Sequence, residues 1–171
     1  MVKIYEFLIK SNLLSTLKAN ETKSIYNELK KLPESYKIVG ENKLKNITGV
    51  DFIVIGSTGI FAIKINILDG PIAYNGKELT RWKLPFEKNI LKSTATSVYS
   101  LQNLLKPKLK ENCIVEPVLV FSNFKTKMAF GLNPVENIFI IQKKLLLKLI
   151  QERPTIYDEF KINKIAQILE L

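Results

Sequence analysis

Histidine is absent from this sequence of 171 residues, and cysteine occurs once, at Cys113. Without histidine the protein lacks the usual general base of neutral-pH catalysis and the commonest ligand of transition metals. Serine–histidine and cysteine–histidine mechanisms are therefore excluded. A single cysteine forms neither an internal disulfide nor a multi-cysteine zinc site, and because Cys113 lies in an apolar run we expect a buried, unreactive thiol.

Membrane-length apolar segments are also lacking. The uncharged run from Phe52 to Ile63 is far shorter than the roughly 20 residues that span a bilayer, and the lysine-interrupted start from Met1 to Lys10 is a poor signal peptide. Glycine and proline, at seven each, are too few for a low-complexity chain, and 46% hydrophobic residues are typical of a folded domain. We therefore expect one cytoplasmic domain, residues 1–171, without membrane contact.

Arginine and acidic residues are scarce relative to lysine. The chain has 26 Lys and Arg, of which only Arg81 and Arg153 are arginine, against 16 Asp and Glu, and its formal net charge is +10. This balance favours polyanionic partners through counterion release. Because the lysines are spread along the chain, a solvated lysine-rich surface without a partner explains the charge about equally well.

The apolar pattern predicts alternating helices and strands. Residues 1–18 suit either a strand or the start of a helix, and Asn20 is a suitable N-cap for a first helix that ends at Pro33. Strands are predicted at Tyr36–Leu44, Val50–Ile55, Ile60–Asn66, Ile114–Phe121 and Asn137–Ile141, a hairpin at Ile72–Tyr74 with Leu79–Leu84, and helices at Glu87–Leu105, Gln142–Glu152 and Thr155–Leu171. The first three strands follow one another too closely for parallel crossovers, so the predicted fold class is α/β with a mixed sheet.

The last predicted helix carries an apolar stripe. Thr155, with Asp158 three residues later, is a capping-box-like start, and the stripe consists of Ile162, Ile165, Ala166 and Leu169. We expect this stripe to pack against the protein's own core. A homodimer or a protein partner bound through the C-terminal helices is the alternative.

Polar side chains interrupt the two central strands. Asp51 opens the first of these strands, and Lys64 and Asn66 lie in the second. Because side chains alternate along a strand, Lys64 and Asn66 share one face. Glu21 falls four residues before Ile25, in the first turn of the predicted first helix, where it is either favoured by the helix dipole or aimed into a site.

The order of these residues resembles the nuclease-related (NERD) domain, within the PD-(D/E)xK nuclease superfamily. The resemblance covers roughly residues 20–121 and rests on Glu21 in a helix, Val50–Gly56, Gly59–Ile63, Gly70, Trp82, Asn89 before a long helix, and Val118–Phe121. It implies a restriction-endonuclease-like core in which helices flank a mixed sheet, in the order helix, three strands, helix, strand. Residues 1–19 are then an N-terminal extension, and residues 136–171 add a C-terminal strand and helices.

The resemblance also implies a catalytic site. In this superfamily two carboxylates hold Mg²⁺, which activates water, and a lysine orients the nucleophile. The corresponding positions here are Glu21, Asp51, Lys64 and Asn66. The family strand has an acid, any residue and a lysine, whereas this chain has lysine at 64 and asparagine at 66. It also departs from the family at Phe52, where histidine is typical, and near Ser93, where glutamine is common.

Lysine in place of an acid repels a divalent cation. At ~4 Å each unit of charge is worth about 4 kcal/mol at an effective dielectric near 20, doubled for a divalent ion. We therefore expect no magnesium cofactor and an inactive pseudo-enzyme. In this hypothesis the Lys64 ammonium stands where the metal would stand and pairs with Asp51 and with Glu21. Alternatively, Lys64 extends to solvent and Asp51 only caps a turn.

Three functions follow from these expectations. The first is sequence-nonspecific binding of DNA or RNA through a basic cleft, for which the resemblance suggests Lys64, Lys83, Lys88 and Lys92. The second is an active divalent-metal-dependent endonuclease, with metal on Asp51 and Glu21 and the missing acid supplied by Glu41, Asp69 or Glu87. The third is a protein-interaction scaffold that uses the last helix or Lys143–Ile150.

Overall fold

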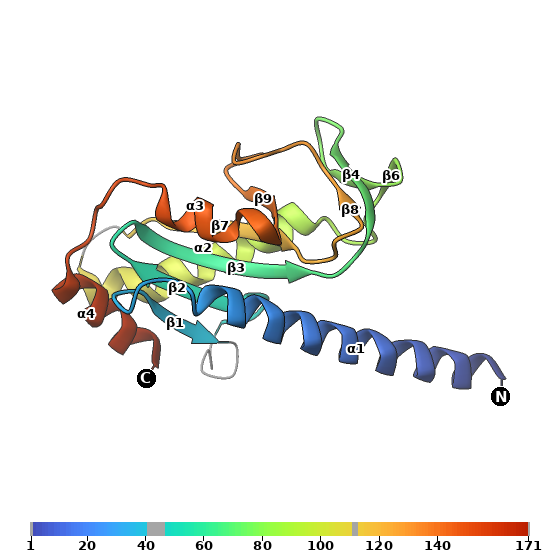
Figure 1. Ribbon diagram of the computed structural model, residues 1–171, viewed down its shortest axis with the longest axis horizontal. Coiled ribbons are helices and arrows are strands. Elements are labelled where there is room, and N and C mark those ends of the chain that lie inside the picture. The colour runs from blue at the N-terminus through green and yellow to red at the C-terminus, as the bar shows by residue number, and fades with distance from the viewer. Residues whose placement is uncertain (1, 41–46, 111–112, 171) are drawn as a thin grey trace.

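A five-stranded mixed sheet lies between two layers of helices (Figure 1). The computed structural model describes residues 2–40, 47–110 and 113–170, and within them the side chains from residue 12 to residue 169. In chain order the elements are α1 (Val2–Leu29), β1 (Lys37–Gly40), β2 (Phe52–Gly56), β3 (Gly59–Asn66), β4 (Gly70–Tyr74), β5 (Leu79–Arg81), β6 (Leu84–Pro85), α2 (Ile90–Leu109), β7 (Val115–Phe121), β8 (Thr126–Lys127), β9 (Phe139–Gln142), the 3-10 turn η2 (Lys143–Leu145), α3 (Leu146–Gln151) and α4 (Glu159–Glu170).

The main sheet has the strand order β1-β2-β3-β7-β9. Its first three strands are antiparallel, and a tight turn joins β2 to β3 at the pair Gly56 and Gly59. The later strands are parallel, because the chain leaves β3 and returns to β7 through α2, and β9 then pairs with β7 in the same direction. The predicted mixed α/β sheet is confirmed.

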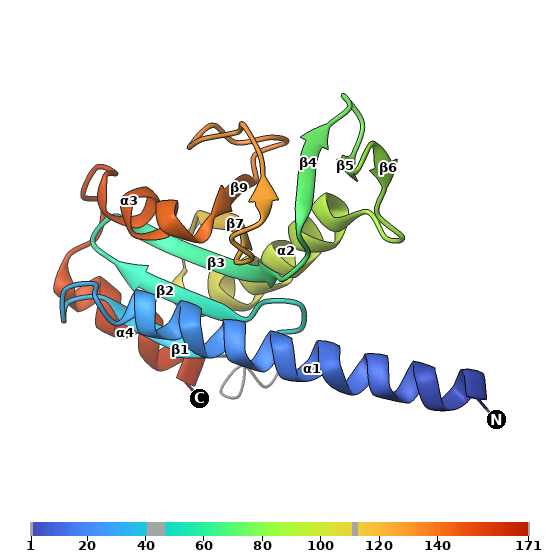
Figure 2. The same ribbon diagram turned by 45° about the vertical axis from the view of Figure 1, so that its right-hand side comes forward.

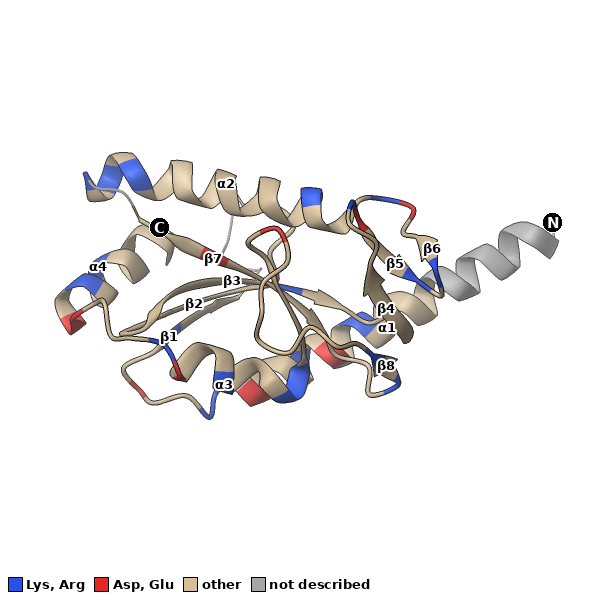
Figure 3. Ribbon diagram, turned by 90° about the horizontal axis from the view of Figure 1, so that it is seen from above, with Lys and Arg blue, Asp and Glu red and all other residues tan. Residues whose placement is uncertain are grey.

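Strands β2 and β3 are buried on both faces because helices cover the sheet on either side. Ile53 and Ala62 face α2 and α4, where they join one apolar cluster. Val54 and Phe61 face the opposite way, toward α1 and α3, in a second cluster. Figure 3 shows α2 and α3 on opposite sides of the sheet. The alternation predicted from sequence therefore decides which side chains can meet which helix.

A second, smaller sheet with the order β6-β5-β4-β8 stands beside the end of the main sheet (Figure 2). Ile72 of β4 and Leu79 of β5 pack with Leu91 of α2 and Phe121 of β7 in a third apolar cluster. Strand β4 also pairs in parallel with β8, which places Gly70 opposite Thr126. The predicted hairpin is thus one part of a sheet that also receives the segment after β7.

Helix α1 corrects the predicted N-terminal boundary. It is one helix of 28 residues, so Asn20 lies inside it and is not an N-cap. The segment from residue 2 to residue 32 has no glycine or proline that would break a helix, and a favourable capping residue alone does not start one. Glu21 is consequently far from the first turn, and a favourable interaction with the helix dipole does not explain its position.

The C-terminal elements also differ in detail from the prediction. Helix α4 begins at Glu159, and Asp158, not Thr155, caps it by accepting the Lys161 backbone N–H at 2.8 Å. The apolar stripe from Ile162 to Leu169 is buried against the protein's own sheet and α2, as expected. The segment expected as one helix from 142 is the end of β9, a 3-10 turn and the short α3. Glu41 and the rest of the predicted first strand beyond Gly40 lie outside the described residues. None of the helices that the structure describes is long and apolar enough to cross a membrane.

Candidate functional site

Asp51 is a buried carboxylate with both oxygens engaged. Its exposed fraction is 3%. Oδ1 lies 2.9 Å from the Lys18 ammonium, and Oδ2 accepts the Ile65 backbone N–H at 2.6 Å. The Asp51 N–H in turn donates to the Ile63 carbonyl at 2.8 Å. Asp51 therefore extends the pairing of β2 with β3 by one residue before the start of β2, and its carboxylate neutralises one cation.

The cation on Asp51 is Lys18, which sequence analysis did not identify. The predicted direct pair between Lys64 and Asp51 or Glu21 is wrong, because no such ion pair forms among these described side chains. Lys18 comes from α1, and its side chain is 49% exposed. Since residues 1–18 were ambiguous and the first helix was placed from residue 20, Lys18 was not assigned to any face. A continuous helix would have placed it one turn before Glu21.

Lys64 is held by α2. Its ammonium donates to Ser93 Oγ at 3.0 Å, and that hydroxyl donates to the Ile90 carbonyl. Burial lowers the pKa of Lys64, the negative charge of Asp51 opposes this shift, and the positive charge of Lys18 adds to it. Lys64 therefore interacts with Asp51 through space without a direct ion pair. By the resemblance described above, an acid is expected at position 64 and a glutamine near position 93, whereas here a lysine and a serine form a hydrogen bond.

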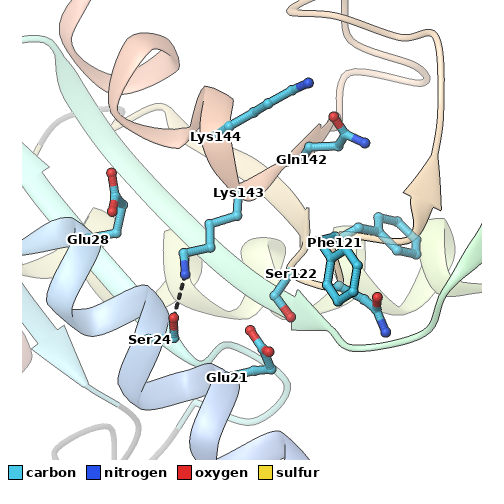
Figure 4. Close-up of a pocket in the computed structure, with 10 residues that line it drawn as sticks. Glu21, Ser24, Glu28, Phe121, Ser122, Gln142, Lys143 and Lys144 are labelled. Atoms are coloured by element: carbon cyan, nitrogen blue, oxygen red, sulfur yellow. Dashed lines mark hydrogen bonds between the residues drawn. The ribbon is translucent and has the colours of Figure 1, made fainter.

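The side chains of Asn66 and Glu21 have different surroundings in the structure. Asn66 Oδ1 accepts the Leu68 N–H at 2.9 Å, so this side chain closes a local turn at the end of β3. Glu21 lines a cavity of about 560 Å³ between α1 and the ends of β7 and β9. Figure 4 shows Glu21 opposite Ser122, with Lys143 reaching α1, where it donates to Ser24. The structure thus brings Asp51 and Lys64 together and places Glu21 in a neighbouring cavity.

The residues around Asp51 do not suit a magnesium ion. Magnesium prefers several oxygen ligands in octahedral geometry. Asp51 instead faces two ammonium groups, and no group of three or more His, Cys, Asp or Glu side chains that could hold a metal occurs in the part of the chain that the structure describes. Of the alternative acids, Asp69 is paired with Arg81, which lowers the Asp69 pKa, and Glu87 is exposed before α2, whereas Glu41 lies outside the described residues.

Three of the four predicted nucleic-acid-binding lysines lie along one exposed segment. Lys83 is in the turn between β5 and β6, Lys88 precedes α2, and Lys92 is in its first turn, where the Lys92 N–H donates to the Asn89 cap. Figure 3 shows basic residues in this region at the same end of the molecule as β5 and β6. Lys64 does not belong to this exposed set, because its side chain is partly buried and its ammonium donates to Ser93.

The tip of the β5–β6 hairpin has an unusual conformation. Its central residues Trp82 and Lys83 have φ values of 53° and 65°, and both are side-chain-bearing residues in the left-handed region. Two-residue hairpin turns of this kind favour Asn-Gly, and an unsuited residue costs about 1–3 kcal/mol. Trp82 is nevertheless 62% exposed, with its ring edge against Gly70, where an added Cβ would come within 2.5 Å of Nε1.

The family comparison agrees with this arrangement of elements. The family model of the nuclease-related domain, NERD, matches residues 17–122, which is more than half of the chain. The match begins just before Lys18 and ends just after β7, so it includes Asp51, Lys64 and Trp82. A search of curated proteins and a search of solved structures each found no significant match.

Proposed function

Because this chain belongs to the family of nuclease-related (NERD) domains, we propose that it keeps the nuclease fold as a nucleic-acid-binding module and does not cleave its ligand. The observation that carries the proposal is the state of Asp51. Both of its carboxylate oxygens are engaged, one by Lys18 and one by the Ile65 N–H, inside a protein interior that leaves it 3% exposed.

Electrostatics supports the loss of metal chemistry. A magnesium ion on Asp51 would have to displace the Lys18 ammonium and then remain close to Lys64. Each repulsion between a divalent ion and a lysine at ~4 Å is worth about 8 kcal/mol at an effective dielectric near 20. Glu21, Asp51, Lys64 and Asn66 are therefore proposed as family positions that now have structural roles.

The proposed ligand contact is electrostatic. Lys83, Lys88 and Lys92 are exposed on one segment, and the chain carries a formal net charge of +10. Lysines bind phosphates as point charges without selecting a base, so binding should be indifferent to sequence and should weaken steeply with salt. Lys64 contributes to the positive field of the domain, but because it is partly buried and one of its three N–H groups donates to Ser93, we propose a smaller part for it in phosphate contact than for the three exposed lysines.

The first experiment tests the inactive site. Magnesium and manganese binding is measured by calorimetry on the wild type, on Lys64→Glu with Asn66→Lys, and on the same variant with Lys18→Ala added. Each protein is then incubated with plasmid and single-stranded DNA. We expect no metal binding and no cleavage by the wild type, and metal binding only when the family acid is restored and Lys18 is removed. Metal-dependent cleavage by the wild type would contradict the proposal.

The second experiment tests binding through the three lysines. Charge reversal at Lys83, Lys88 and Lys92 should abolish salt-dependent binding of a labelled oligonucleotide, measured by fluorescence anisotropy at several salt concentrations. The matched control reverses Lys106, Lys108 and Lys110, which are also exposed, at the opposite end of α2. Equal losses in both triple variants would show that only net charge matters, and would exclude a defined binding surface.

A further inference from the structure

Two tight turns present the same pair of residue types to solvent. The β5–β6 turn has Trp82 followed by Lys83 at its centre, between the paired residues Arg81 and Leu84. The turn from Asn123 to Thr126 has Phe124 followed by Lys125 at its centre, and the Thr126 N–H donates to the Asn123 carbonyl at 3.0 Å. In each turn an aromatic ring and a lysine are displayed together.

Both rings are more exposed than a folding role requires. Trp82 is 62% exposed and Phe124 is 89% exposed. Phe124 contributes almost nothing to any apolar cluster, and Trp82 uses a backbone conformation that favours other residues. Large exposed aromatic side chains on rigid turns are a common feature of ligand-binding surfaces.

The turns themselves are firmly anchored. Asn123 Oδ1 accepts the Lys125 N–H at 2.9 Å, and the Thr126 hydroxyl donates to the Leu68 carbonyl at 2.9 Å. The Trp82 N–H donates to the Pro71 carbonyl at 3.1 Å. Because β4 and β8 are paired, both turns are attached to the same small sheet. The backbone that carries the two aromatic rings is therefore fixed before a ligand binds, which lowers the ordering cost of binding.

A cavity of about 430 Å³ connects the two turns. Trp82 lines one part of it, and Lys125 and Lys127 line another. The acid in the same cavity, Asp69, is already paired with Arg81, so the remaining charge of the lining is positive. Phe124 of the same turn lines the 560 Å³ cavity that Glu21 also lines. The turn thus contributes to both cavities, with Phe124 in the lining of one and Lys125 in the lining of the other.

We infer that this surface, Trp82 and Lys83 with Phe124, Lys125 and Lys127, binds single-stranded nucleic acid. One base stacks on Trp82 and another on Phe124, while the lysines contact the phosphates between and beside them. The combination of aromatic platforms and a basic groove is how proteins bind unpaired nucleotides without base preference. A duplex hides its base faces and can use only the lysines. The inference rests on the proposed function and specifies its ligand.

The Lys125 ammonium lies 5.8 Å from the centroid of the Phe124 ring. A cation at this distance interacts with one face of the ring and leaves the other face for a base. The same lysine also lines the Trp82 cavity, so it sits between the two proposed stacking positions. Lys125 should therefore matter more than any single lysine of the segment that contains Lys88 and Lys92.

Trp82 provides a direct readout because it is the only tryptophan. Its fluorescence is recorded while the full-length protein is titrated with oligothymidylate, oligouridylate and a matched DNA duplex, each about 20 units long, which exceeds the site of one binding module. We expect saturable quenching by the single strands, with DNA and RNA compared in separate titrations. The duplex should bind about tenfold or more weakly at the same salt concentration and should not quench.

Variants separate stacking from charge. Phe124→Ala should weaken single-strand binding about tenfold, the usual scale for one stacked base, and should change duplex binding less than about twofold. Because Phe124 is 89% exposed, this variant should fold normally, as circular dichroism will show. Tyr99→Ala on α2 is the matched control, since Tyr99 is 65% exposed and lines neither cavity. A second variant, Lys125→Glu, should reduce binding of both ligands.

The outcomes distinguish this inference from the proposed function. If neither single strand nor duplex binds in a salt-dependent manner, the proposed function fails and the inference fails with it. If both bind equally, without quenching and without an effect of Phe124→Ala, only the inference is overturned. Quenching by either type of single strand, with loss of affinity in Phe124→Ala but not in Tyr99→Ala, supports it.

Discussion

The region around Asp51 and the region around Trp82 lie in the same family-matched segment but are built in opposite ways. Asp51 is buried, with Lys18 and the Ile65 N–H on its two oxygens. Trp82 is exposed, in a strained turn beside the 430 Å³ cavity that it lines. Where polar groups satisfy one another inside the protein, they stabilise it, and where aromatic and basic groups remain unsatisfied at the surface, they are available to a ligand.

The two regions also differ in how fully their polar groups are hydrogen-bonded. The described part of the chain has no buried side-chain nitrogen or oxygen without a hydrogen-bond partner, so the buried polar side chains of the Asp51 region are all hydrogen-bonded. A catalytic centre usually keeps some such groups unsatisfied for its substrate or metal. The Trp82 region, by contrast, pays a conformational cost for exposing an aromatic ring.

Asp51→Ala should have the largest effect, because it removes the carboxylate that holds the Asp51 region together. It leaves the Ile65 N–H without its acceptor and removes the anion between Lys18 and Lys64. We expect a loss of about 2–4 kcal/mol in the free energy of unfolding, measured with urea. The exposed pair of Glu152 with Lys148 provides the control, since Glu152→Ala should cost less than about 0.5 kcal/mol. Similar losses in the two variants would mean that Asp51 is not a structural centre.

Lys18→Ala should have the next largest effect. The variant leaves Asp51 buried with only one oxygen engaged, but half of the Lys18 side chain is in solvent, which weakens the pair. We therefore expect a loss of about 1–2 kcal/mol. Lys31→Ala is the control, because Lys31 pairs with Glu28 at 2.7 Å in a more exposed setting and should contribute a few tenths of a kcal/mol. If Lys18→Ala costs no more than Lys31→Ala, Lys18 is an ordinary surface lysine.

Much of the fold and of the Asp51 region could be predicted from the sequence, and the features that could not be predicted were missed for physical reasons. Strand periodicity and short connections predicted the mixed sheet and the positions of Asp51 and Lys64, because alternation and loop length depend on local sequence. The partner of Asp51 was missed because it depends on the length of α1, and a favourable cap at Asn20 suggested a boundary that tertiary structure does not use.

The Trp82 region was harder to anticipate. Trp82 was only a marker of family resemblance, and nothing in the Trp82-Lys83 dipeptide indicates a turn with positive φ at both positions. Phe124 lay in an unassigned loop, and its relation to Trp82 depends on the pairing of β4 with β8, which joins segments more than fifty residues apart. A pairing of only two residues on each strand is too short to give a periodic pattern in the sequence.

Lys83→Gly should sharpen the contrast by stabilising the β5–β6 turn of the Trp82 region. Glycine adopts the φ of 65° at this position without steric cost, so the free energy of unfolding should rise by about 1 kcal/mol. Lys83→Ala has the same loss of charge but retains the strain, and it should give no such gain. If the two variants are equally stable, the turn is not strained, and the argument that it is maintained for ligand binding is lost.

Lys64→Met should give the smallest effect, and one that depends on pH. Burial lowers the pKa of Lys64 below its ordinary value of 10.5, so between the lowered and the ordinary pKa the unfolded chain binds more protons at this position than the folded protein. The stability of the wild type relative to Lys64→Met should therefore rise as the pH rises through this window toward 10.5. Asp51 opposes the shift, so the same comparison in an Asp51→Asn background should show a steeper rise. Urea unfolding at a series of alkaline pH values measures both slopes. If the difference in stability between the wild type and Lys64→Met does not change with pH, Lys64 is solvated. The Asp51 region would then be more accessible to water than its hydrogen bonds indicate.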